Sequence, residues 1–254
     1  MSSSKLCAVS MVRNEPFAVY GVLSIINYIS KITIIDTGST DGTYEELQEL
    51  QKQFKSKIVL EQRNLEDGHN WNINNNNHVD SSGVPPHVSK ALGDIRRELH
   101  DRAESDWVLT LDGDEVWPET LIDHVRSVVY QNACGNNAIF LPFIDFIIDC
   151  TMIRQIHLMG RVYRKDITVI KGNFPYEMHH NKLTGHCYGI TSYDSFVVKT
   201  QHGFVNHFEC LLKPFRKAKN IVAHNGHQLP QVIYDNLERF PRIKPYVESN
   251  WVED

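Results

Sequence analysis

A short apolar segment recurs three times in the first half of this sequence, and each copy runs directly into a polar cluster. These segments, 6–12, 32–35 and 107–111, are rich in β-branched and aliphatic residues, and helical patterns lie between them. Such alternation is typical of βαβ units, which build a mostly parallel sheet with helices on its faces. The sequence therefore predicts an α/β fold with a Rossmann-like, mostly parallel sheet flanked by helices.

Helix signals fall between the predicted strands. Pro16 suits the first turn of a helix, and Thr43 with Glu46 three residues later predicts a capping box. Apolar residues at helical spacing predict a third helix over 88–103, and Pro118 opens a fourth. Each predicted strand is thus connected to the next by a helix.

The second half has a different pattern. Strands are predicted over 138–143, 146–148, 155–163, 168–170 and 195–200, and helices over 211–223 and 231–240. We expect an α+β half built onto the same sheet, so that residues 1–254 form one domain with halves 1–137 and 138–254. The polar stretch 64–86 is too long for a routine connection, and we predict a mobile loop or an insertion that acts as a lid.

Charge and cysteine content narrow the function classes. The chain has 26 Lys and Arg against 31 Asp and Glu, a formal net charge of −5, so its composition favours neither nucleic acid nor an anionic membrane as a partner. Its five cysteines form no Cys-x-x-Cys pair, which predicts a reducing, cytoplasmic location. Neither a signal peptide nor a transmembrane segment is expected, because no apolar run approaches about 18 residues.

The Asp112-Gly113-Asp114 sequence has the form of a metal site. In an open parallel sheet, ligands bind beyond the carboxyl ends of the strands, and this motif follows a predicted strand directly. Carboxylates at i and i+2 project to the same side, and the glycine between them permits close approach. Two hard oxygen donors suit Mn²⁺ or Mg²⁺, with water and a diphosphate completing the shell. The alternative is a turn that caps the helix beginning near Pro118.

Three segments together resemble the family 2 glycosyltransferases, which have the GT-A fold. They are 9–15 (VSMVRNE), 34–43 (IIDTGSTDGT) and 103–115 (AESDWVLTLDGDE), and they cover roughly the first half of the chain. The resemblance implies a GT-A-type sheet whose first half binds a nucleotide-sugar and a metal ion. A UDP-sugar is the favoured donor, with GDP- and dTDP-sugars as alternatives.

The resemblance also assigns residues. Asp36 would contact the base or ribose, although a simple turn-former is the alternative, and Thr37 stands where the family often has a second aspartate. A basic residue near the donor phosphates corresponds to Arg96 or Arg97, and for each the alternative is an exposed helical arginine. The expected donor-binding residues are Val12, Arg13, Asn14, Glu15, Asp36, Gly38, Ser39, Asp41, Arg96, Arg97, Asp112 and Gly113.

Less of the second half matches: 160–165 (GRVYRK) and 172–180 (GNFPYEMHH) are similar to an arginine-containing strand and a downstream Glu/His element in some members of the family. Inverting transfer needs a carboxylate to take the proton of the acceptor hydroxyl, and Glu177 or Asp145 is the candidate base, with Glu177 favoured and a structural carboxylate as the alternative. His207 lies where related enzymes supply a late metal ligand, and His179 and His180 compete for that role. The expected metal ligands are Asp112, Asp114 and His207.

These observations predict a metal-dependent glycosyltransferase that moves a hexose or pentose from a nucleoside-diphosphate sugar to an acceptor hydroxyl with inversion. Glycan, protein and small-molecule acceptors stay open, as does the oligomeric state. One alternative is a nucleotidyltransferase acting on sugar phosphates, but Arg13-Asn14-Glu15-Pro16 lacks the glycines of its usual phosphate loop. Another is a nucleotide- or carbohydrate-binding module without catalytic activity.

Overall fold

The computed structural model describes nine stretches of the chain. They are residues 5–65, 86–131, 138–147, 152–165, 168–171, 174–177, 195–208, 222–223 and 229–248. Within them, only the backbone is described for residues 86–90, 147, 152–157, 168–171, 174–177, 195–197 and 222–223. The predictions for most of loop 64–86, for His179 and His180, and for most of helix 211–223 lie outside the described residues.

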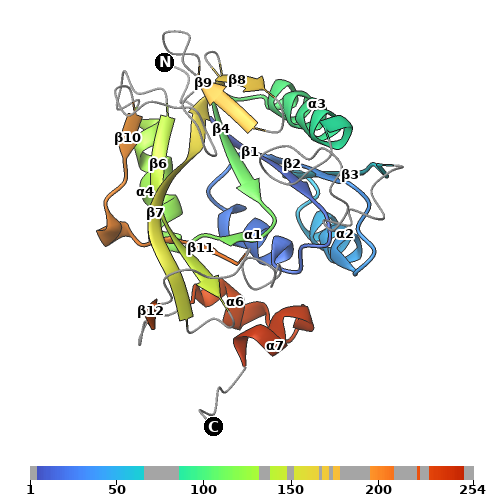
Figure 1. Cartoon of the computed structure of the whole chain (residues 1–254), viewed down its shortest axis with the longest axis vertical. Coiled ribbons are helices and arrows are strands. Elements are labelled where there is room, and N and C mark those ends of the chain that lie inside the picture. Colours follow the sequence, from blue (N-terminus) through green and yellow to red (C-terminus); the bar gives the residue numbers. More distant parts are fainter. Residues whose placement is uncertain are drawn as a thin grey trace.

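Four parallel strands form the first half of the main sheet, in the order β3, β2, β1, β4 (Figure 1). They are β1 (Leu6–Val12), β2 (Ile32–Asp36), β3 (Ile58–Gln62) and β4 (Trp107–Asp112). The central strands are apolar and almost entirely buried, as parallel strands covered on both faces must be. This order is that of a Rossmann half, so the predicted α/β class is confirmed.

Helices cover both faces of these strands. The helices α1 (Ala18–Ile25), α2 (Thr43–Gln53) and α4 (Glu119–Tyr130) share one apolar core with the sheet. On the other face, α3 (Pro86–Arg102) contributes to a second, smaller core. Side chains that alternate along β1 divide between the two cores.

The predicted capping box at the start of α2 is not formed. Thr43 is the first residue of the helix, and Gly42 occupies the N-cap position at φ +96° without a side-chain cap. The Thr43 hydroxyl accepts a hydrogen bond from the backbone N–H of Glu15, and the Glu46 carboxylate accepts one from Arg242. Contacts with distant segments therefore use the polar groups that would have formed the local cap.

The second half of the chain extends the same sheet. Strands β6 (Ala138–Ile147) and β7 (Met152–Arg164) form an antiparallel pair, and β7 also runs antiparallel to β4. Strand β11 (Val205–His207) lies between β6 and the short β5 (Glu115–Val116). The remaining strands are β10 (Ser195–Val197) beside β6, β12 (Val222–Ala223) beside β7, and the separate pair β8 (Thr168–Lys171) and β9 (Phe174–Glu177).

Some predicted strand limits in this half are wrong. The predicted segments 138–143 and, as far as the structure describes it, 146–148 are parts of one continuous strand, β6, which runs to Ile147, because a shift in register around Asp145 absorbs the irregularity between them. The predicted strand 195–200 stops three residues early and is followed by a 3-10 turn, η4 (Thr200–His202).

The C-terminal helix is also shorter than predicted. Instead of running over 231–240, it ends as α6 (Gln231–Asn236), and the chain continues through the 3-10 turn η5 (Pro241–Ile243) into α7 (Lys244–Val247). Phe240 precedes a proline and has a non-helical backbone (φ −125°, ψ 74°), through which no helix could continue.

The C-terminal segment packs back against the first half of the chain. In Figure 1, α6 lies beside α1. The Tyr20 hydroxyl donates a hydrogen bond to the carbonyl of Phe240, and Phe17 stacks on Phe208 with ring centroids 4.0 Å apart. The two ends of the described chain therefore share one core.

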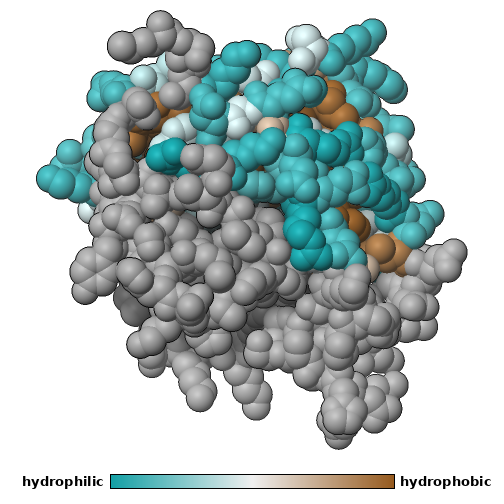
Figure 2. Space-filling model, turned by 90° about the horizontal axis from the view of Figure 1, so that it is seen from above, coloured by the Kyte–Doolittle hydropathy of each residue, from teal (hydrophilic) through white to brown (hydrophobic). Residues whose placement is uncertain are grey.

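The surface seen from above in Figure 2 is mainly hydrophilic over the described residues, with small separate apolar patches. Charged side chains of α3, among them Asp94 and Arg97, contribute to the described surface. None of the helices in the described part of the chain combines the length and the apolar character needed to cross a membrane.

Candidate donor and metal site

The three polar clusters predicted from the sequence meet at one edge of the sheet. Strand register places Met11 beside both Ile35 and Asp112, and Val12 beside Asp36. The carboxyl ends of β1, β2 and β4 therefore open onto the same region, which is where open α/β sheets bind their ligands.

The loop after β1 is hydrogen-bonded to the loop after β2. The backbone N–H of Asn14 donates to Ser39 Oγ at 2.9 Å, and the N–H of Thr40 donates to Asn14 Oδ1 at 2.8 Å. Asn14 has φ +52°, a left-handed conformation that asparagine tolerates better than most residues. The two predicted donor loops thus form one connected unit.

Asp36 is fully buried at the end of β2. Its Oδ1 accepts hydrogen bonds from the backbone N–H groups of Gly38 (3.0 Å) and Ser39 (2.8 Å), and from the Gln62 amide at 3.4 Å. Its Oδ2 is also buried but has no hydrogen-bond partner among the described residues. A buried acceptor left in this way costs about 1–3 kcal/mol, so a ligand that donates an N–H or O–H here would relieve that cost.

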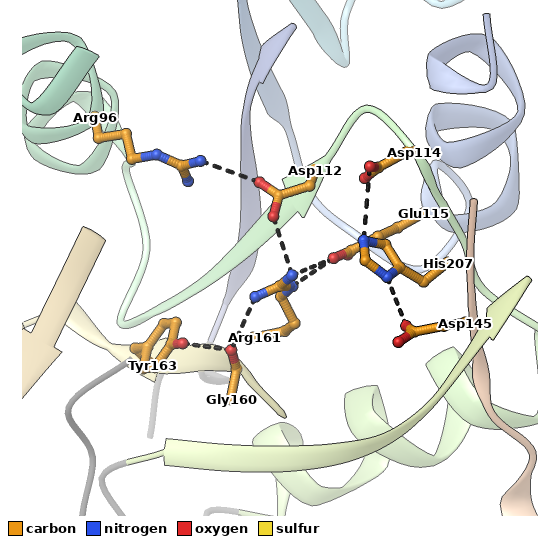
Figure 3. Close-up of polar contacts among 9 residues, drawn as sticks. All are labelled: Arg96, Asp112, Asp114, Glu115, Asp145, Gly160, Arg161, Tyr163 and His207. Carbon is orange, nitrogen blue, oxygen red and sulfur yellow. Dashed lines mark hydrogen bonds and ion pairs between the residues drawn. The ribbon is translucent and has the colours of Figure 1, made fainter. Parts of the chain in front are cut away.

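Asp112 is held by two arginines from different elements (Figure 3). Arg96 Nη2 of α3 donates to its Oδ1 at 3.2 Å, and Arg161 Nη2 of β7 donates to its Oδ2 at 3.0 Å. Burial by itself would raise the pKa of Asp112, but the positive charges of Arg161 and Arg96 lower it below the ordinary value. Asp112 is therefore an anion already paired with cations.

Arg161 and Glu115 form a buried ion pair beneath Asp112. Arg161 is 1% exposed and Glu115 is fully buried; Arg161 Nε donates to Glu115 Oε1 at 2.7 Å, and Nη2 donates to the same oxygen. The Arg161 guanidinium also lies 5.0 Å from the ring centroid of Phe143. Desolvation raises the pKa of Glu115 to about 7, although Arg161 opposes this shift.

The sequence analysis did not name Arg161 or Glu115 as site residues. The signal for Arg161 is an arginine directly before two residues that are buried, Val162 and Tyr163, because a buried guanidinium needs a carboxylate partner. Glu115 gives a similar signal, since it follows the Asp112-Gly113-Asp114 motif directly and begins the buried strand β5.

His207 joins the two halves of the site. Its Nε2 lies 3.6 Å from Asp114 Oδ2, and its Nδ1 lies 2.7 Å from Asp145 Oδ1 (Figure 3). Strand β11 makes this possible, because it pairs His207 with Asp145 on one side and with Glu115 on the other. Burial would lower the pKa of His207, but Asp114 and then Asp145 raise it well above its usual range.

The side chains at this edge of the sheet include types that bind divalent cations. Asp114 supplies carboxylate oxygen and His207 supplies imidazole nitrogen, both of which are ligands for Mn²⁺. Asp112, the third predicted ligand, lies two residues away, and its oxygens are engaged by Arg96 and Arg161. No group of three or more His, Cys, Asp or Glu side chains surrounds a common point within the described residues. Asp114 and His207 therefore fit as two ligands, which leaves the other positions to ligand oxygens and water.

The structure also places three other residues that were predicted to bind the donor. Gly113 lies against Glu15, since a Cβ atom on Gly113 would be 2.8 Å from the Cβ and Cγ of Glu15. Asp41 pairs with Arg242 at the outer side of the loop. Arg97 pairs with Asp94 along the partly exposed face of α3.

Two predicted catalytic carboxylates are also placed. Asp145 is buried against His207, which makes it a hydrogen-bond partner of the imidazole. Glu177 ends β9 in the two-stranded sheet with β8, and its side chain lies outside the described residues. In Figure 1 this small sheet lies next to α3, the helix that carries Arg96.

No protein-family model matches the sequence, and no curated protein matches it either. Among solved structures, the fold is similar to the mannosyltransferase PcManGT from Pyrobaculum calidifontis in complex with GDP-Man and Mn²⁺, with 18% identity and a TM-score of 0.36 over 55% of this chain and 35% of that chain. It is also similar to S. aureus TarS, with 14% identity and a TM-score of 0.38 over 64% of this chain.

That match covers 29% of TarS and 48% of a shorter form, TarS 1–349. The chain thus spans less than half the length of each of these proteins. Each likeness covers part of a fold at low identity and shows no more than a similarity of fold.

Proposed function

We propose that this chain is a metal-dependent glycosyltransferase of the family 2, GT-A type, which transfers a sugar from a nucleoside-diphosphate sugar to an acceptor hydroxyl with inversion. One observation carries the proposal. At the edge where the parallel strands end, the carboxylates of Asp112 and Asp114 lie among Arg96, Arg161 and His207. Alternating anionic and cationic side chains at such an edge suit a metal-bound diphosphate.

The nucleoside would bind over β1 and β2. The buried Oδ2 of Asp36 would accept a hydrogen bond from the nucleoside, either from a ribose hydroxyl or from the ring N–H that uracil, thymine and guanine carry. A UDP-sugar is the favoured donor, with GDP- and dTDP-sugars as alternatives. Asn14 and Ser39 would shape this pocket by holding the two loops together.

The diphosphate would bind beside β4. Asp114 and His207 would hold Mn²⁺ or Mg²⁺, with Asp145 fixing the His207 ring through Nδ1. The cation, when bound, supplies positive charge to the departing diphosphate. Arg96 is only 12% exposed in its side chain and faces the same region, so it would add a second positive charge.

The acceptor would approach from the second half of the chain, within a single catalytic domain. A carboxylate would take the proton of the acceptor hydroxyl while that oxygen bonds to the anomeric carbon and the bond to the diphosphate breaks. We propose Glu177 for this role, because Asp145 is buried and engaged by His207. A glycan, a protein side chain or a small molecule would serve as acceptor.

A panel of donors tests the proposal. UDP-, GDP- and dTDP-sugars are each added with and without Mn²⁺, and the melting temperature and the released product are measured. We expect one donor to raise the melting temperature only with Mn²⁺ and to be slowly hydrolysed to the nucleoside diphosphate. Release of pyrophosphate in the presence of a sugar phosphate and a nucleoside triphosphate would instead indicate a nucleotidyltransferase. Donor binding without turnover on any acceptor would indicate a binding module.

A further inference from the structure

Arg242, near the C-terminal end of the described chain, reaches the loop that follows β2. Its Nη1 donates hydrogen bonds to Thr43 Oγ1 at 3.2 Å and to Glu46 Oε2 at 2.9 Å. Its Nη2 donates to Thr43 Oγ1 at 3.2 Å and to Asp41 Oδ2. One guanidinium thus contacts two carboxylates and a hydroxyl, all within six residues of the loop and the start of α2.

Thr43 connects the Arg242 side chain to the loop after β1. Its hydroxyl oxygen accepts a hydrogen bond from the backbone N–H of Glu15 at 3.1 Å and donates to Asp41 Oδ1 at 2.7 Å. Gly42 lies under the Arg242 side chain, where an added Cβ would be 3.7 Å from Arg242 Cδ. The side chain therefore covers the left-handed residue on which the turn depends.

Glu15 in turn contacts the Asp112-Gly113-Asp114 motif. Its Cβ and Cγ lie against Gly113, close enough that a Cβ on Gly113 would be 2.8 Å away. Gly113 separates Asp112 from Asp114. A continuous series of direct contacts thus runs from Arg242 through Thr43 and Glu15 to the proposed diphosphate site.

The segment that bears Arg242 is firmly attached to the core. Ile243, the next residue, is fully buried. Phe240 accepts a hydrogen bond from Tyr20 and packs edge-on against its ring at 6.3 Å. Arg239 donates to Glu49 at 2.8 Å and to Gln53 at 2.7 Å. The guanidinium therefore acts from a fixed support and not from a free chain end.

We propose that Arg242 is a positioning residue that holds the turn 38–43, and through Thr43 and Glu15 the Asp112-Gly113-Asp114 motif, in the arrangement that binds the nucleoside diphosphate. This inference rests on the proposed function. The described contacts of Arg242 are with Asp41, Thr43 and Glu46, so in this role its loss should weaken donor binding more than it slows the chemical step. Arginine suits this position better than lysine, because the planar guanidinium spreads its N–H donors over two Nη atoms that reach Asp41, Thr43 and Glu46, whereas the donors of a lysine ammonium share one nitrogen.

Arg242→Gln, Arg242→Lys and the control Lys244→Gln test this role in the full chain. Lys244 lies in the same segment and pairs with the exposed Glu238, so its replacement removes the same charge without touching the turn. For Arg242→Gln we expect about a tenfold or larger rise in the Kd for UDP with Mn²⁺ and in the donor KM, with kcat changed by less than about threefold. Arg242→Lys should recover part of the affinity, and Lys244→Gln should match the wild type.

Amide hydrogen exchange over residues 36–46 provides a readout that needs no substrate. We expect faster exchange in this segment for Arg242→Gln and unchanged exchange for Lys244→Gln. If exchange, Kd and KM are all the same in Arg242→Gln as in the wild type, or if kcat falls as much as KM rises, the positioning role is wrong. If the wild type turns over no donor, the proposed function fails while the exchange experiment still decides whether Arg242 holds the turn.

Discussion

The oxygens of Asp112 receive hydrogen bonds from two elements that are far apart in the sequence, α3 through Arg96 and β7 through Arg161. Arg161 is also the charged partner of Glu115 in a region closed to solvent. A buried charge that loses its partner is strongly destabilising, because it can be neither solvated nor neutralised cheaply. Stability and the geometry of the proposed diphosphate site therefore depend on the same guanidinium.

Replacement of Arg161 by methionine tests this dependence. We expect Arg161→Met to lower the free energy of unfolding by about 3–5 kcal/mol, because Glu115 is left buried without its cation. The measurement is urea denaturation followed by circular dichroism. Arg97→Gln is the control, and it should change stability by less than about 0.5 kcal/mol because its pair with Asp94 is partly exposed.

A double variant separates the charge effect from lost packing. Arg161→Met with Glu115→Gln removes both charges, so we expect it to be more stable than Arg161→Met alone. If the double variant is no more stable than Arg161→Met, the loss of stability would come from the lost packing against Phe143. The explanation by an unpaired, buried Glu115 charge would then be wrong.

At the scale of elements, α1 and β5 approach each other unusually closely. A Cβ atom on Gly21 would be 2.5 Å from the backbone oxygen of Glu115, which is too short for any real contact. The glycine thus lets α1 lie directly on the strand that continues from the Asp112-Gly113-Asp114 motif. Helix and motif must shift together if this space is filled.

Gly21→Ala is therefore expected to destabilise the fold even though alanine favours helices. We expect a loss of about 1–3 kcal/mol in the free energy of unfolding, since backbone atoms must move to accept the new methyl group. Thermal and urea unfolding measure it. A neutral or stabilising effect, as helix propensity alone would predict, would show that α1 can move away from β5 without cost.

The sequence predicted elements well where local pattern decides them. Strands β1, β2 and β4 are short apolar runs covered on both faces, so their position and the polar residues that follow them could be read directly. Strand β11 is different, because its three residues are fixed by pairing with β5 and β6 across the sheet. His207 could be named as a ligand candidate from resemblance, but its contact with Asp145 could not be predicted.

The contacts of the loop after β2 could not be predicted from local pattern either. The pattern of Thr43 and Glu46 predicts a local capping box, but Arg242, about 200 residues further along the chain, uses both side chains. A contact of that sequence separation leaves no local signal. The ion pair between Arg161 and Glu115 was missed for a related reason, since these residues are 46 positions apart in the sequence and meet only when the sheet is assembled.

At the scale of the whole molecule, the proposed site needs both halves of the chain. Asp36, Asp112 and Asp114 come from the first half, whereas Arg161 and His207 come from strands of the second half that extend the same sheet. The formal net charge is −5, but the described cations Arg96 and Arg161 gather at this edge beside the carboxylates. The fold thus concentrates opposite charges where a metal-bound diphosphate would bind.

The most direct test of this account is Mn²⁺-dependent release of nucleoside diphosphate from the preferred donor, measured for the wild type, Asp114→Asn and the control Glu45→Gln. Glu45 is an exposed residue of α2, so its replacement should leave the rate within about twofold. Asp114→Asn should fold normally, bind Mn²⁺ more weakly and lose about a hundredfold or more of the rate, because a carboxylate ligand has been removed. A folded Asp114→Asn protein with the wild-type rate and Mn²⁺ dependence would contradict the account.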